Sequence, residues 1–134
     1  MEFAWLSRWQ PQLLAVLRIV AGLLFLEHSI SKFFGFPVPF AMQPLPPLFM
    51  AAGVIELIGG ILITLGLWAR IAAFIASGEM AIGYWMMHFP KSPWPLANMG
   101  ESAIFFCFVF LYIAAAGPGA WSIDGARMKN GPVR

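Results

Sequence analysis

The sequence has few of the residues on which soluble enzymes rely. Of its 134 residues only 10% are charged, and there is a single cysteine, Cys107. One cysteine excludes an internal disulfide and a CxxC redox pair, so any redox chemistry must use another group. The net charge is only +2 and there is no basic run, which argues against nucleic acid as a partner. The sequence also has no nucleotide-binding loop and no catalytic triad motif.

Apolar residues, in contrast, make up 60% of the chain and give a mean hydropathy of +0.79. Apolar runs of roughly 20 residues are typical of membrane-spanning helices. Four such runs predict an all-α fold, an integral membrane four-helix bundle, with spans at about 14–35, 48–67, 70–89 and 96–116. An interfacial segment, 1–12, precedes the transmembrane domain, 13–124, and a polar cytoplasmic tail, 125–134, follows it.

The basic residues predict how the helices are oriented. Those on the side of both termini are Arg8, Arg70, Arg127, Lys129 and Arg134, with Arg18 near them. The opposite side has only Lys91 and the helix-end Lys32. The positive-inside rule therefore places both termini in the cytoplasm and the two proline-rich loops, 37–47 and 90–95, outside.

Two segments of the chain resemble each other. RIVAGLLFLE from Arg18 and RIAAFIASGE from Arg70 both begin Arg-Ile-x-Ala, have a Glu nine residues after the Arg, and then reach Phe-Pro. The pattern indicates a parallel repeat of two helical hairpins, related by an axis along the membrane normal. Coincidence between two apolar helices would produce the same pattern, so both interpretations stay open.

Each predicted span carries one acid. These are Glu27, Glu56, Glu79 and Glu101. An ionised side chain near the bilayer centre costs about 2.5–3.5 kcal/mol, so each acid needs a partner or must be neutral. Glu56 shares a helix face with Ala52, Gly53, Gly59 and Gly60, and such small residues allow another helix to approach closely.

Six polar side chains fall at a common depth in the outer half of the bilayer, at about 1.5 Å of helix rise per residue. They are His28, Lys32, Glu56, His88, Asn98 and Glu101. Two interpretations of this cluster stay open. One is ion pairing that fixes helix register, such as Lys32 with Glu56 or Glu101. The other is a pocket for a polar ligand, a quinone head group or a proton path.

Three further charged residues lie within the spans. Arg18 lies on the same stripe as Lys32, closer to the cytoplasmic side. Glu27 and Glu79 lie near mid-membrane on separate faces, where burial favours the neutral acid. Each would then form a hydrogen bond with the backbone or with a partner subunit, or take part in proton transfer.

The sequence does not favour a metal site. Di-iron bundles place Glu-x-x-His pairs on one helix face, whereas here Glu27 and His28 are adjacent and Glu79 precedes His88 by nine residues. Haem ligation by the two histidines is also disfavoured, because both lie near one membrane surface. We therefore expect no metal and no intrinsic cofactor.

Four stretches, LRIVAGLLFLEHSISKFFGF, AGVIELIGGILITLGLWAR, HFP…NMGES and AAAGPGAWSIDG, resemble the DoxX family of small bacterial membrane proteins. The resemblance covers about Leu13 to Asp124. The positions that match the family pattern are Arg18, His28, Lys32, Glu56, Arg70, His88, Asn98, Glu101 and Gly117-Pro118-Gly119, whereas Glu27 and Glu79 do not match it. The resemblance implies a multi-pass protein of the bacterial inner (plasma) membrane, linked with thiosulfate:quinone oxidoreductase and with complexes that handle oxidative and thiol stress. It implies no particular catalytic residue.

The leading hypothesis is a redox-associated subunit, at most an accessory to a quinone-linked oxidoreductase. It would hold a quinone head group or a small polar substrate, while a partner membrane or redox protein supplies the electron-transfer cofactor. Lys32 and His28 would donate hydrogen bonds, and Glu56 and Glu101 would accept protons. The alternatives are a non-catalytic scaffold or assembly factor, and a small-solute or proton transporter that would need a homodimer.

Overall fold

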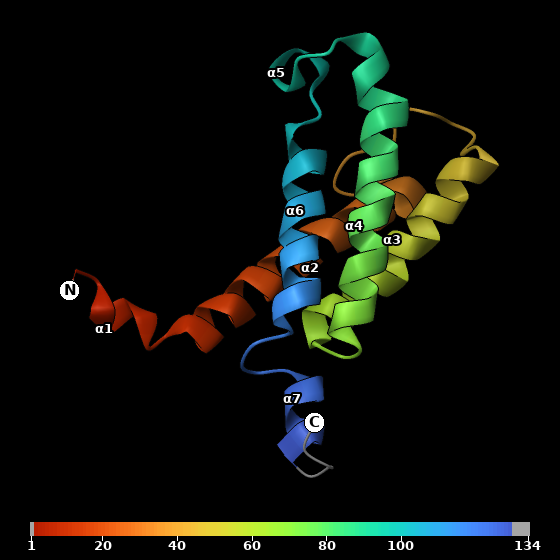
Figure 1. Ribbon diagram of the computed structural model, residues 1–134. Helices are drawn as coiled ribbons and strands as arrows, with labels where there is room; N and C mark the ends of the chain where they lie inside the picture. Colours follow the sequence, from red (N-terminus) through yellow and green to blue (C-terminus); the bar gives the residue numbers. More distant parts are fainter. Residues whose placement is uncertain (1, 130–134) are drawn as a thin grey trace.

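The computed structural model describes residues 2–129, which form helices and connecting loops without any strand (Figure 1). The long helices are α2 (Gln10–Phe34), α3 (Pro47–Leu65), α4 (Ala69–Gly83) and α6 (Glu101–Ala116). Short helices lie at α1 (Ala4–Ser7), α5 (Pro95–Asn98) and α7 (Ile123–Lys129). α4 continues into a π-helical turn, η1 (Tyr84–His88), and a 3-10 turn, η2 (Phe89–Lys91). The predicted all-α class is confirmed.

The long helices form two hairpins. α2 packs mainly against α3, and α4 packs mainly against α6, while α3 and α4 are joined by a short turn and diverge away from it (Figure 1). The hairpins meet in a core where Phe25 of α2 packs edge-on against Phe110 of α6, with ring centres 4.9 Å apart. α4 contributes Ala72, Ala73 and Ala76 to this core. Alanines allow its backbone to approach closely, as is typical of helix packing in membranes.

The small residues around Glu56 bring α3 close to α2, as the sequence predicts. A Cβ atom added to Gly60 would lie 3.0 Å from the Cα of Leu26, and one added to Gly53 would lie 2.7 Å from the ring of Phe33. A side chain at Gly60 would therefore force the two helices apart, whereas one at Gly53 would displace the Phe33 ring. Glu56 lies between the two glycines on this interface and is only 2% exposed.

Two long helices begin at residues that differ from the sequence-based expectation. The first long helix, α2, begins at Gln10 and not near residue 14. The fourth long helix begins at Glu101 and not near residue 96, because Met99 has a left-handed backbone (φ 60°) that separates α5 from α6. The segment expected to be the tail begins within α7, which spans Ile123–Lys129. Arg134, which contributes to the predicted orientation, lies outside the described residues.

Two of the described helices, α2 and α3, are long and apolar enough to cross a bilayer. α6 is also apolar, but its 16 residues span about 24 Å, which is less than the roughly 30 Å hydrocarbon core. Large apolar side chains are exposed on all four long helices, for example Leu23, Ile58, Ile71 and Phe108. Such surfaces suit contact with lipid or with another membrane protein.

Candidate functional site

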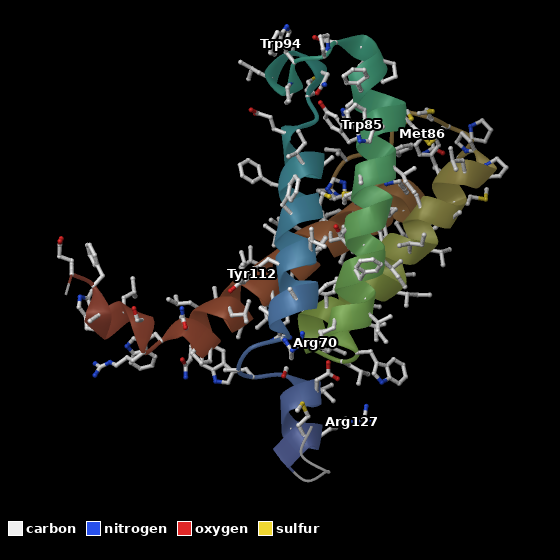
Figure 2. All side chains as sticks on the ribbon, in the orientation of Figure 1. Arg70, Trp85, Met86, Trp94, Tyr112 and Arg127 are labelled. Atoms are coloured by element: carbon white, nitrogen blue, oxygen red, sulfur yellow. The ribbon has the colours of Figure 1, made fainter. Side chains whose placement is uncertain are left out.

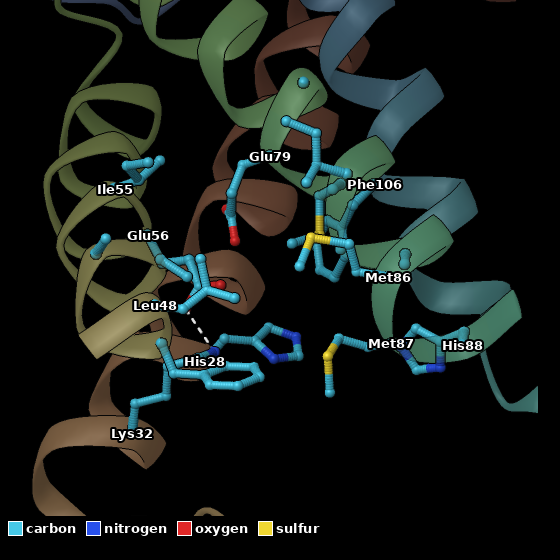
Figure 3. A pocket seen from close by; sticks show the side chains of 18 of the residues that line it. His28, Lys32, Leu48, Ile55, Glu56, Glu79, Met86, Met87, His88 and Phe106 are labelled. Carbon is cyan, nitrogen blue, oxygen red and sulfur yellow. Dashed lines mark hydrogen bonds and ion pairs between the residues drawn. The ribbon is translucent and has the colours of Figure 1, made fainter. Parts of the chain in front are cut away.

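A pocket of about 620 Å³ lies between the diverging helices α3 and α4, with α2 and α6 behind it (Figure 3). Most of its lining is apolar, including Ile55, Met86 and Phe106. Its ionisable lining residues are His28, Lys32, Glu56, Glu79, His88 and Lys91. An apolar cavity of this size with a few convergent polar groups is typical of small-molecule sites.

Lys32 and Glu56 form a buried ion pair on one wall of the pocket. Lys32 Nζ lies 2.8 Å from Glu56 Oε1, and the two side chains are 8% and 3% exposed (Figure 3). Lys32 comes from the last turn of α2, where a cation interacts favourably with the helix dipole. Its ammonium also lies 5.0 Å from the ring centre of Phe40 in the proline-rich loop. Of the two pairings considered from the sequence, Lys32 therefore pairs with Glu56 and not with Glu101.

Glu79 of α4 joins this group, which the sequence did not predict. Its side chain points into the pocket toward Glu56 (Figure 3) and interacts with both Glu56 and Lys32. We expected Glu79 on a separate face because, nine residues after Arg70, it lies opposite Arg70 on a helical wheel. That opposite face looks into the space between α3 and α4, where Glu56 lies.

The two histidines line the pocket from different helices. The ring of His28 packs edge-on against Phe106 of α6, with centres 5.6 Å apart, and the residue is exposed. His88 belongs to η1, and its Nδ1 lies 2.9 Å from the carbonyl oxygen of Asn98. That contact fixes the His88 ring beside Tyr84, on which it stacks. A π-helical turn is often found at functional sites, and here it positions a pocket residue.

Asn98 has the predicted depth but a different environment. It is fully buried, and its Nδ2 donates to the hydroxyl of Tyr84 at 3.0 Å and to the carbonyl of Ser92 at 2.9 Å. Its Oδ1 accepts from the N–H of Gly100 at 2.8 Å. Both amide hydrogens are therefore used, so Asn98 holds the loop between η2 and α6 and has no donor left for a ligand.

The other two acids also lie away from the pocket lining. Glu101 is exposed in the first turn of α6, where a negative charge is favoured by the helix dipole. Glu27 is exposed on α2. The six residues of common depth therefore divide into two groups. His28, Lys32, Glu56 and His88 line the pocket together with Glu79, whereas Asn98 and Glu101 do not.

Arg18 is a structural residue of the opposite end of the bundle. Its guanidinium is completely buried and donates to the carbonyls of Ile63 and Thr64, both at 3.1 Å, in the last turn of α3. Its other terminal nitrogen donates to the carbonyls of Ala120 and Trp121. Carbonyls at the end of a helix have no partner within the helix, so Arg18 both satisfies them and anchors the segment after α6.

Arg70 makes the corresponding contact in the second hairpin. Its Nη1 donates to the carbonyls of Ala114 and Ala115 in the last turn of α6, at 3.1 and 2.6 Å. In both hairpins, an arginine on the first helix thus binds the end of the second. A glycine with positive φ follows each time, Gly66 (φ 70°) and Gly117 (φ 93°), and a Cβ atom there would meet the guanidinium. These matching contacts are those expected of a parallel repeat.

Asp124 has a capping role that no local sequence pattern indicates. Its two carboxylate oxygens accept hydrogen bonds from the N–H groups of Trp68 and Ala69, at 2.8 and 2.9 Å, where α4 begins. An acid at a helix N-terminus satisfies free N–H groups and interacts favourably with the dipole. Because this cap comes from more than 50 residues away, it could not be identified as a capping motif.

Within residues 2–129, no group of three or more His, Cys, Asp and Glu side chains is placed to hold a metal ion. Cys107 belongs to α6, and its carbonyl accepts a hydrogen bond from Ser77 Oγ of α4 at 2.7 Å.

Comparison with protein families matches the part of the chain that contains most of the pocket. A family model for DoxX matches residues 13–89, a range that contains every acid and histidine lining the pocket. An uncharacterised protein of Haemophilus influenzae is 39% identical over 131 residues, which cover 93% of this chain and 98% of that protein. No solved structure matches the chain.

Proposed function

Since this chain belongs to the DoxX family, whose members are membrane-associated, we propose that it is a membrane subunit that binds the head group of a quinone or a similar lipophile. The ligand would occupy the pocket between α3 and α4. The observation that carries this proposal is a buried Lys32–Glu56 ion pair on the wall of an otherwise mostly apolar pocket of about 620 Å³. A partner membrane or redox protein would supply the electron-transfer cofactor.

The chemistry of the pocket suits a flat head group with carbonyl acceptors and an apolar tail. The Lys32 ammonium has three N–H donors. Among the described residues, its hydrogen-bond partner is Glu56. Ile75, Ile82 and Met86 line the pocket and are among the exposed large apolar side chains of the molecule. The pocket is therefore continuous with the lipid-facing surface, so that an isoprenoid tail can stay in the bilayer while the head group reaches Lys32.

The proposal includes four helices across a bacterial inner membrane, with both termini in the cytoplasm. Arg70 and Arg127 lie toward one end of the molecule, and Trp85 and Trp94 lie toward the other (Figure 2). Basic residues favour the cytoplasmic side, and tryptophans favour either interface. The pocket is lined by His88 of η1, the turn that contains Trp85, and would then open in the outer half of the bilayer.

A second candidate is a non-catalytic scaffold, in which the buried charges only hold the helices in register. It is favoured by the contacts of Arg18 and Asn98, which serve helix ends and a loop. The scaffold predicts that changes to Lys32 and Glu56 lower stability without removing a separable binding activity.

The test is binding of decylubiquinone to the purified protein in lipid nanodiscs, followed by quenching of tryptophan fluorescence. The double variant Lys32→Met Glu56→Gln should bind at least about tenfold more weakly, which corresponds to about 1.4 kcal/mol. Glu101→Gln is the matched control, because Glu101 is exposed and outside the pocket lining, and it should bind as the wild type does. Absent binding, or equal binding by all three proteins, would overturn the proposal.

A further inference from the structure

Glu79 is a second acid in the pocket, and the Lys32–Glu56 ion pair leaves no further cation to balance its charge. Lys32 is already held by Glu56 at 2.8 Å. Arg18 and Arg70 are committed to backbone carbonyls at the other end of the bundle. Glu79 Oε1 is buried and has no hydrogen-bond partner among residues 2–129.

The side chain of Glu79 points toward Glu56 (Figure 3), and both acids line the same pocket. Two ionised carboxylates can only accept hydrogen bonds, so neither acid could satisfy the other unless one of them carried a proton. The same conclusion follows from the charges. Lys32 balances one carboxylate, and a second negative charge in an apolar, buried site would repel the first.

The other groups that face this acid pair do not change the balance. His28 from α2, His88 from η1 and Lys91 from η2 line the same pocket. The Nδ1 atom of His88 is in contact with the carbonyl oxygen of Asn98, and His28 packs on Phe106. Lys91 of η2 is exposed. Lys32 is the cation that interacts with both acids.

We propose that Glu79 carries a proton, which it shares with Glu56 and offers to a neutral hydrogen-bond acceptor on the ligand head group. This assignment rests on the proposed function and specifies the ligand class. A carbonyl of a quinone, or an ether or ester oxygen of a neutral lipid, complements the O–H of a carboxylic acid. A lipophilic carboxylate would face two acids, and a lipophilic amine would have to displace the proton.

Three probes in nanodiscs test this assignment: decylubiquinone as the neutral acceptor, dodecylamine as the cation and laurate as the anion. The wild type should prefer decylubiquinone. Glu79→Gln keeps N–H donors at the same place and should bind it within a few-fold of the wild type. Glu79→Met keeps the side-chain length but removes the donor, and should weaken binding by about tenfold. Glu27→Met, an exposed acid on α2, should change nothing.

A second measurement reports on the proton without any ligand. The infrared spectrum of the wild type should contain the C=O stretch of a protonated, buried carboxyl group at neutral pH, and Glu79→Gln should lose it. The thermal unfolding temperature of Glu79→Gln is the control. If it is unchanged, loss of the band assigns the protonated carboxyl group to Glu79 and does not result from unfolding.

The outcomes separate this assignment from the proposed function. If the wild type does not bind decylubiquinone at all, the proposed function fails and the ligand role of Glu79 fails with it. If it binds decylubiquinone but Glu79→Met binds equally well, only the assignment to Glu79 is overturned. Preference for dodecylamine, lost in Glu79→Gln, would overturn the protonated state and identify a cation site.

Discussion

Removing one member of the Lys32–Glu56 ion pair should cost more stability than removing both. Lys32→Met leaves Glu56, which is 3% exposed, without its cation. Glu56→Gln leaves the Lys32 ammonium, but Glu79 also interacts with Lys32 and, once ionised, would replace the charge of Glu56. We therefore expect Lys32→Met to be the more destabilising single change. The double variant leaves no unpaired charge from this pair.

The size of the effect follows from the geometry. Two charges 2.8 Å apart attract with about 6 kcal/mol at an effective dielectric constant of about 20. Desolvation offsets much of this attraction, and breaking a buried pair from one side costs about 3–5 kcal/mol. We expect a loss of about 3–5 kcal/mol for Lys32→Met, about 1–3 kcal/mol for Glu56→Gln and less than about 2 kcal/mol for the double variant.

The assay is reversible unfolding of the four proteins in detergent micelles, read by circular dichroism and arranged as a double-mutant cycle. The coupling energy should be at least about 1.5 kcal/mol. Glu101→Gln, an exposed Glu-to-Gln change, should stay within about 0.5 kcal/mol of the wild type. If the two single effects add to the double effect within about 0.5 kcal/mol, the buried ion pair does not exist as described.

Two further pairs of variants test the packing that positions the pocket. Arg18→Met leaves buried carbonyls unpaired, so it should lower the free energy of unfolding by about 3 kcal/mol and expose the chain after Gly117 to protease. Arg70 is exposed, so Arg70→Met should cost about 1 kcal/mol. Equal losses in unfolding free energy would contradict the distinction. Gly60→Ala should lower stability by about 1–3 kcal/mol, because its Cβ would lie 3.0 Å from Leu26 Cα. Gly78→Ala, with nothing within 4 Å of its Cβ, should be neutral or stabilising by up to about 1 kcal/mol. Thermal unfolding that ranks the two glycines in the opposite order would refute the close approach of α2 and α3.

The sequence could predict what depends on one helix at a time. Long apolar runs locate the four long helices, and the small residues around Glu56 identify the face where α2 approaches. Helix rise places Lys32 and Glu56 at a common depth, and the structure brings them together. These inferences need only the period and rise of an α-helix, which are fixed by the backbone.

What depends on the order of helices in space could not be predicted. The helical wheel places Glu79 opposite Arg70 but does not say that this face meets α3, so Glu79 was separated from Glu56. Common depth likewise grouped Asn98 and Glu101 with the pocket, although Asn98 is used by Tyr84 and Ser92 and Glu101 is exposed. The cap by Asp124 is a contact between distant parts of the chain.

Labelling with a photoreactive azidoquinone, mapped by mass spectrometry of peptides, tests most directly whether the pocket between α3 and α4 binds a quinone. We predict labels on the lining segments that contain Ile55, Met86 and Phe106, suppressed by excess decylubiquinone and reduced in Lys32→Met Glu56→Gln. The apolar groove between α2 and α6, lined by Leu17, Leu24 and Phe105, serves as the internal comparison. Labelling of that groove in place of the pocket, or labelling that decylubiquinone does not suppress, would contradict the assignment of the pocket.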